Sequence, residues 1–185
     1  MTRHVYSIAK VCVTTLMLFS FSCATDPADA SLEQESKGHT QIHPEDDCDP
    51  ATFGALCRAG FRGGTTLDEF RAQFAASFRV PAWEYGGGQI RVNLGSSFRV
   101  DNQGGETHSF TIVQNFGGGR VAPLNNPNEA VAPECLAAQS ASNVDIASGA
   151  GITVTTGANG TIKTRGTFRV QCCIHPWMRT TAQIQ

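Results

Sequence analysis

The fold of this protein is decided by one stretch near its C-terminus, Gly166-Thr167-Phe168-Arg169-Val170-Gln171-Cys172-Cys173-Ile174-His175-Pro176-Trp177-Met178. Its first half predicts a β-strand, in which successive side chains point to opposite faces. Phe168, Val170 and Cys172 then share one face, and this face is the apolar one. We therefore expect Cys172 to point into the core and the neighbouring Cys173 to point away from it.

Three side chains that can bind a metal follow one another at three-residue intervals in this stretch. They are the thiol of Cys172, the imidazole of His175 and the thioether of Met178. A tight loop after the strand can bring His175 and Met178 back to the point that Cys172 faces. The sequence therefore predicts a cluster of three ligands at one end of this strand.

A fourth ligand is expected from a second strand, predicted over residues 106–113. His108, Phe110 and Ile112 share a face of this strand, and that face is again the apolar one. Two inward-facing ligands on separate strands can meet at one end of a β-sandwich. We therefore expect His108 to join the cluster.

This set of ligands predicts a particular metal. Two histidines, one cysteine and a weak axial methionine define a blue-copper electron-transfer site. Soft sulfur ligands favour Cu(I), whereas imidazoles also suit Cu(II), so the ion rearranges little when an electron moves. An apolar shell around the site tunes its reduction potential and excludes water.

At residues 81–185 the sequence resembles the cupredoxins of the plastocyanin, pseudoazurin and amicyanin family, most specifically where the Gly-Thr-Phe strand runs into Cys-x-x-His-Pro-x-Met. The resemblance implies that His108, Cys172, His175 and Met178 bind one copper ion. It also implies that the protein carries single electrons between larger redox partners, through the exposed edge of His175. Pro176 and Trp177 are then expected to form an apolar docking surface around that edge.

The sequence departs from the family pattern in two places. Ser109 stands where the family often has an asparagine that ties the two ligand loops together, and a serine can form a weaker version of that bond. The second departure is the extra Cys173, which leaves open which of two adjacent cysteines binds metal. Spacing and strand facing favour Cys172. Cys173 would then be free to pair with Cys135, and we state this pairing as a hypothesis.

The rest of the C-terminal part is predicted to be a β-sandwich. Period-two patterns predict strands over 89–94, 97–101, 106–113, 152–156, 161–172 and 180–185. Residues 114–151 interrupt this pattern and predict a crossover or insertion with one short helix. The pattern predicts an all-β sandwich over residues 81–185 with a short N-terminal helical extension. The resemblance implies that this sandwich is a cupredoxin-like Greek key.

The extension is predicted over residues 48–80. Asp49 followed by Pro50 predicts one helix start, and Thr66 with Glu69 forms a capping box that opens a second helix. Apolar residues then recur at three- and four-residue steps, which indicates a helix docked on the main domain. They are Leu67, Phe70, Phe74 and Phe78. Cys48 and Cys57 are expected to pair and so to staple the extension.

The N-terminus predicts export to the periplasm or cell envelope of a bacterium. Residues 1–30 resemble a signal peptide, with a basic start, an apolar stretch and small residues at two cleavage sites. Lipid anchoring at Cys23 is the alternative. Residues 31–47 are polar and acidic, and predict a flexible linker. Removal of the first thirty residues leaves five cysteines, an odd number, so two disulfides leave one thiol over for a metal.

Composition narrows the function. The chain of 185 residues has a net charge of -2, which gives no reason to expect nucleic acid or an anionic membrane surface as a partner. Zinc is disfavoured as the metal, because Met178 belongs to the predicted ligand set and methionine is a poor zinc ligand. A binuclear copper centre needs two cysteines four positions apart, and multicopper enzymes need more histidines. Cys172 with His175 lacks the oxyanion device and the third orienting group that a nucleophile needs. We therefore expect no enzyme.

Two other functions remain possible on this fold. The first is a copper-binding or copper-delivery protein that does not carry electrons, although a delivery site would favour exposed, methionine-rich ligands. The second is an interaction domain without metal. The expected partners are redox proteins, and the sequence does not identify them.

Overall fold

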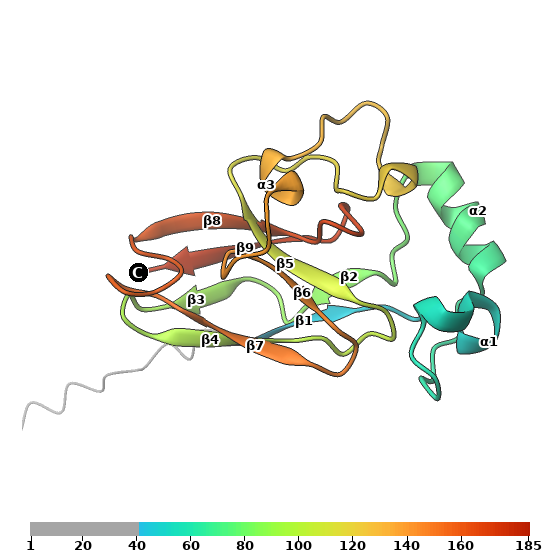
Figure 1. The fold of residues 1–185 in the computed structure, drawn as a ribbon, viewed down its shortest axis with the longest axis horizontal. Coiled ribbons are helices and arrows are strands. Elements are labelled where there is room, and N and C mark those ends of the chain that lie inside the picture. Colours follow the sequence, from blue (N-terminus) through green and yellow to red (C-terminus); the bar gives the residue numbers. More distant parts are fainter. Residues whose placement is uncertain (1–40) are drawn as a thin grey trace, which may run out of the picture. The chain divides into compact units, whose positions relative to one another are not determined.

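The computed structural model describes residues 41–185, which form two β-sheets and a few short helices (Figure 1). The strands are β1 (Gln41–Glu45), β2 (Glu84–Gly86), β3 (Ile90–Val92), β4 (Ser97–Asp101), β5 (His108–Val113), β6 (Asn143–Ile146), β7 (Gly151–Thr155), β8 (Gly166–Gln171) and β9 (Arg179–Ile184). The helices are α1 (Pro50–Phe53), α2 (Leu67–Ser77) and α3 (Pro133–Leu136), with single 3₁₀ turns η1 (Gly54–Leu56) and η2 (Ala122–Leu124). The predicted signal peptide, Cys23 and residues 31–40 lie outside the described residues.

The two sheets form the predicted β-sandwich. One sheet has the strand order β2-β1-β4-β7 and the other β3-β9-β8-β5-β6. Both are mixed, because β1 runs parallel to β4 and β3 runs parallel to β9, whereas the other pairs are antiparallel. Alternate side chains of facing strands fill the core between the sheets. Its most deeply buried members include Ile42, Phe98, Val100, Phe110, Val170 and Ala182.

The period-two pattern located six strands, and three others escaped it. One of these corrects the linker predicted over residues 31–47, because residues 41–45 form β1. Ile42 is fully buried and pairs with Val100, while Glu45 faces outward. The acidic run that follows resembled a solvated segment, yet Asp46 is buried. The other two missed strands are β2 and β6.

The insertion over residues 114–151 covers the outer face of β5. It carries the predicted short helix, α3, together with η2 and β6. Val113, Ala132, Cys135 and Cys173 form a second apolar cluster beneath it. The disulfide Cys135–Cys173 joins α3 to the residues that follow β8, as the hypothesis stated. The strand β5 is thus buried on both faces, which explains why Ser109 and Thr111 are inaccessible to solvent.

The helical segment over residues 48–80 has the predicted local signals. Asp49 accepts a hydrogen bond from Ala51 N at the start of α1, and the capping box of Thr66 and Glu69 opens α2. The disulfide Cys48–Cys57 staples the segment. Gly105 lies against this disulfide, so closely that a Cβ at that position would collide with both sulfurs. We call residues 48–78 the helical cap.

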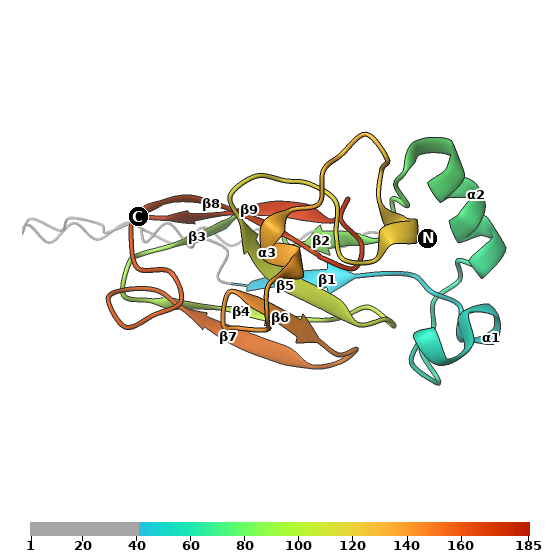
Figure 2. The ribbon, with the colours of Figure 1, turned by 45° about the horizontal axis from the view of Figure 1, so that its top comes forward.

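The cap lies at the end of the sandwich where the loop between β8 and β9 emerges (Figures 1 and 2). Phe70 of α2 packs against Trp83 at a ring separation of 4.9 Å and against Trp177 at 6.1 Å. Phe53 of α1 stacks on Trp83 at 5.8 Å. These aromatic contacts attach the cap to the same end of the sandwich that holds the predicted ligands.

No helix within residues 41–185 has both the length and the apolar character needed to cross a membrane.

Candidate metal centre

Three of the four predicted ligands meet at one point. His108 begins β5, Cys172 follows the last residue of β8, and His175 lies in the loop between β8 and β9. One ligand atom from each lies within 4.8 Å of the other two. The Nδ1 atoms of the two histidines are 3.3 Å apart, and the Cys172 sulfur is 3.9 Å from His108 Nδ1. His108 therefore turns Nδ1 toward the thiol, and His175 turns its own Nδ1 toward that of His108.

The loop from Cys172 to Met178 is closed by its own backbone. Met178 N donates to His175 O at 2.9 Å, and Cys172 N donates to Met178 O at 3.1 Å. These bonds return the chain to the start of β9 directly beside the end of β8. Met178 is 1% exposed and belongs to the main core. Its role as the axial ligand stays a prediction.

The Cys172 sulfur accepts hydrogen bonds from two backbone amides. Ser109 N donates to it at 3.3 Å and His175 N at 3.4 Å. Burial raises the pKa of the thiol, but hydrogen bonds from His108 and His175 together bring it well below its ordinary value of 9.0. The site thus favours the thiolate, which is the form that binds metal.

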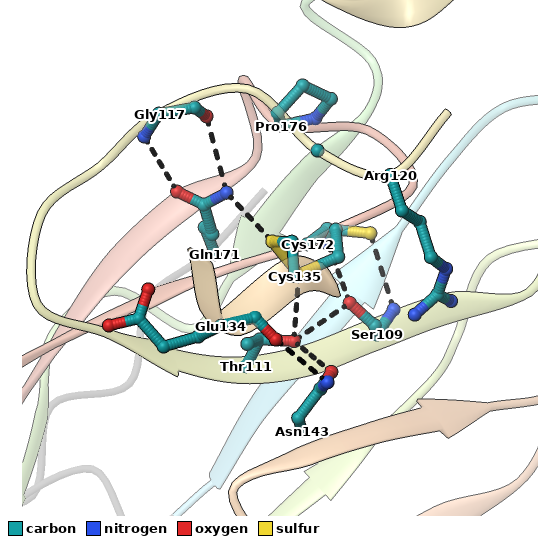
Figure 3. The surroundings of a disulfide bond; sticks show 12 residues. Ser109, Thr111, Gly117, Arg120, Glu134, Cys135, Asn143, Gln171, Cys172 and Pro176 are labelled. Carbon is teal, nitrogen blue, oxygen red and sulfur yellow. Dashed lines mark hydrogen bonds between the residues drawn. A yellow bond between two sulfur atoms is a disulfide. The ribbon is translucent and has the colours of Figure 1, made fainter. Parts of the chain in front are cut away.

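The adjacent cysteines have different fates. Cys173 pairs with Cys135, and Cys172 is the free thiol among the described residues (Figure 3). The strand alternation that separated them in the sequence is therefore confirmed. Ser109 links the two ligand segments as expected, because Cys173 N donates to Ser109 Oγ at 2.6 Å.

Two buried carboxylates contact the imidazoles from behind. Asp46 Oδ2 lies 2.8 Å from His108 Nε2, and Glu106 Oε2 lies 3.4 Å from His175 Nε2. The sequence analysis missed both. Glu106 could have been found, because it lies two residues before His108 and so shares its inward face. Asp46 gave no such signal, because it directly follows β1, and both were assigned to the linker.

The charges of this group are coupled. Burial lowers the pKa of His108, but its hydrogen bonds to Asp46 and to the Cys172 sulfur together outweigh this effect and raise the pKa to about 9. Burial raises the pKa of Asp46, but hydrogen bonds from His108 and Glu106 N outweigh it, so the pKa of this carboxyl is lowered. Burial raises the pKa of Glu106. The metal-free site thus favours a thiolate and a carboxylate around a protonated His108.

The helical cap covers the edge of His175. Trp177 packs against the His175 ring at 5.4 Å, and Phe74 of α2 packs against Trp177 at 5.3 Å. His175 is 3% exposed and Trp177 9% exposed. The expectation of an exposed His175 edge is therefore wrong, because Trp177 packs on the ring and is itself held there by Phe74 and Phe70 of the cap. The docking surface expected around Pro176 and Trp177 stays a prediction.

Comparisons with known proteins bear on the fold. No family model matches the chain, and no curated protein matches it. Among solved structures, the chain is similar to a purple cupredoxin from Nitrosopumilus maritimus at 10% identity and a TM-score of 0.41, covering 78% of this chain and 98% of that one. It is also similar to a Cu(I) form of an amicyanin variant at 14% identity and a TM-score of 0.33, covering 55% and 73%. The β-sandwich itself is defined by the two sheets of this chain, and its side chains carry the evidence for function.

The donor set fits a single small metal ion. Two ligand atoms bound at about 2.1 Å to one tetrahedral ion are roughly 3.4 Å apart, and a sulfur ligand is somewhat farther. The separations of 3.3 Å and 3.9 Å agree with this geometry. Two imidazole nitrogens with one thiolate are the equatorial set of a blue-copper site. The arrangement is therefore a metal centre whose donors suit copper.

Proposed function

We propose that this protein is a one-electron carrier with a single type-1 copper ion, held by His108, Cys172 and His175 with Met178 as a weak axial ligand. The observation that supports this most is the convergence of two imidazole nitrogens and one free thiol within 4.8 Å. Copper, when bound, supplies the Cu(I)/Cu(II) couple that such a ligand set stabilises in both states.

The protein contributes a rigid ligand set. Cys172 and His108 project from the ends of paired strands β8 and β5 and are fully buried. The loop that carries His175 and Met178 is closed by two backbone hydrogen bonds. Close packing lets these ligands move little when the charge of the ion changes, and small movement favours fast electron transfer.

Burial also favours a carrier over a delivery protein. A delivery site must let a partner's ligand reach the metal, whereas the three side chains here are 0–3% exposed. Electron transfer needs only close approach of a partner, because no atom is exchanged. Water is excluded from the ligands by the same packing, which prevents side reactions at the ion.

An absorption spectrum of the purified protein with added Cu(II) tests the proposal. The expected result is an intense blue thiolate-to-Cu(II) band that disappears on reduction and returns on oxidation. Cys172→Ser should abolish the band. A colourless protein that binds only Cu(I) and gives it to a chelator would favour delivery, and no uptake of either ion would favour an interaction domain.

Export and redox partners complete the proposal. A protein with two disulfides suits an oxidising compartment. We therefore propose the periplasm or cell envelope as its location and redox proteins as its partners. Fractionation of cells that express the full chain tests the first point, and recovery in the cytoplasm would contradict it.

A further inference from the structure

The two histidines of the metal centre are each backed by a buried carboxylate, and both carboxylates are anchored. Asp46 has a fully buried side chain, and each of its oxygens is fixed by backbone. Cys48 N donates to Oδ1 at 3.1 Å, and Glu106 N donates to Oδ2 at 2.9 Å. His108 Nε2 lies 2.8 Å from that same Oδ2. These backbone hydrogen bonds therefore hold the Asp46 carboxylate in place independently of its contact with His108.

Glu106 is held in a similar way from the other side. Trp83 donates its indole N–H to Glu106 Oε2 at 2.6 Å, and His175 Nε2 lies 3.4 Å from the same oxygen. Trp83 itself is 1% exposed and packs against Phe53 and Phe70 of the helical cap. The cap thus contacts the centre both through Trp177 and through this hydrogen bond.

These contacts have a common chemical consequence. A neutral imidazole carries one proton, and an acceptor near Nε2 keeps that proton on Nε2, so that the lone pair of Nδ1 is free for metal. The two Nδ1 atoms here face each other next to the Cys172 sulfur, while both Nε2 atoms turn toward carboxylates. Each carboxylate also limits rotation of its ring.

We infer that Asp46 and Glu106 are positioning residues of the metal centre, which fix the tautomer and the ring orientation of His108 and His175. This inference rests on the proposed copper site. The chain just before the helical cap places Asp46 beside His108. Trp83, on which the cap packs, holds Glu106 beside His175. Removal of such a partner usually weakens metal binding about 10- to 100-fold.

The first test needs no variant. In the Cu(I)-loaded wild-type protein, ¹⁵N NMR should find both ligand histidines protonated at Nε2, with protons that exchange slowly because they are hydrogen-bonded and buried. Protons at Nδ1, or Nε2 protons that exchange as fast as those of an exposed histidine, would overturn the inference even if the protein is blue.

The second test measures Cu(II) affinity against a competing chelator. Asp46→Ala should weaken binding about 10- to 100-fold. Asp47→Ala is the matched control, because Asp47 anchors Gly64 N and Thr65 Oγ1 of the same segment at 2.9 Å each and forms no hydrogen bond to a ligand. The control should bind within about threefold of the wild type. Equal losses in both variants would mean that Asp46 acts only through the stability of the segment.

Two substitutions of Glu106, one conservative and one not, test the inference even if Asp46→Ala does not fold. One oxygen, Oε2, faces both Trp83 and His175, so the amide oxygen of Glu106→Gln can replace it. Glu106→Leu removes the acceptor. We expect near wild-type affinity for Glu106→Gln and at least a tenfold loss for Glu106→Leu, with a shifted charge-transfer band. Identical behaviour of the two variants would contradict the inference. A wild-type protein that takes up no copper would instead overturn the proposed function.

Discussion

Removal of the Cys135–Cys173 disulfide tests whether Cys173 serves stability while its neighbour Cys172 binds the metal. Cys173 pairs with Cys135 across 38 positions of the sequence. In the chain-entropy description, a cross-link that closes a loop of this length stabilises the folded state by about 4 kcal/mol, because it restricts the unfolded chain. The double variant Cys135→Ala/Cys173→Ala should therefore lose about that much free energy of unfolding.

The assay is equilibrium unfolding of the metal-free protein in urea, followed by tryptophan fluorescence and circular dichroism. The second disulfide, Cys48–Cys57, spans 9 positions, so its removal should cost less, about 2.5 kcal/mol. Comparing the stability lost on removing each disulfide tests the dependence on loop length. Folded Cys135→Ala/Cys173→Ala should still develop the blue band, because its Cys172 is intact.

Two results would refute this reasoning. Loss of the blue band in folded Cys135→Ala/Cys173→Ala, with retention in Cys172→Ser, would mean that the metal ligand is Cys173. A loss of stability below about 1 kcal/mol would mean that the disulfide does not restrict the unfolded chain as its loop length requires.

Three further predictions concern the centre and its cover. Met178→Gln should keep copper but shift the reduction potential, because the axial bond is weak; voltammetry checks this, and an unchanged potential would exclude Met178 as a ligand. Since the hydrogen bonds of His108 to Asp46 and to the Cys172 sulfur outweigh burial and raise its pKa to about 9, Cu(II) binding below that pH should displace a proton from His108. The apparent affinity should therefore rise about tenfold per pH unit between pH 7 and 9 and level off above; chelator competition measures it, and a flat profile would contradict the protonated His108. Phe74→Ala removes a partly buried ring that packs on Trp177, so it should cost about 2 kcal/mol in thermal unfolding and speed oxidation of the Cu(I) protein by ferricyanide; an unchanged rate would mean that the cap does not limit access.

The sequence predicted the centre well because its ligands obey local rules. Alternation along two strands set the facing of His108, Cys172 and Cys173, and a three-residue spacing placed His175 in the following loop. These rules depend only on residues close together in the sequence, so they do not require knowledge of tertiary contacts. The resemblance to cupredoxins supplied the Greek-key fold class, which alternation alone does not determine.

The parts that escaped prediction depend on distant contacts. The strand β1 contains Pro44 and leads into an acidic run, so its pattern did not distinguish it from a linker. The sequence showed the apolar stripe of α2 but not that this stripe packs against Trp177. A helical pattern identifies the buried face of a helix and does not identify the residues that the face contacts. Asp46 resembled its solvated acidic neighbours, and only the folded chain brings it to His108. The exposed edge expected for His175 failed for the same reason.

The contact between Gly105 and the Cys48–Cys57 disulfide has a consequence for the order of maturation. The bridge packs against Gly105, which precedes Glu106, and it begins two residues after Asp46, so it constrains the backbone next to both backing carboxylates. In the cytosol, where thiols stay reduced, the nascent chain would lack this constraint. If the chain is exported as proposed, metallation should come after translocation and oxidation, which would spare the cell premature capture of cytosolic metal.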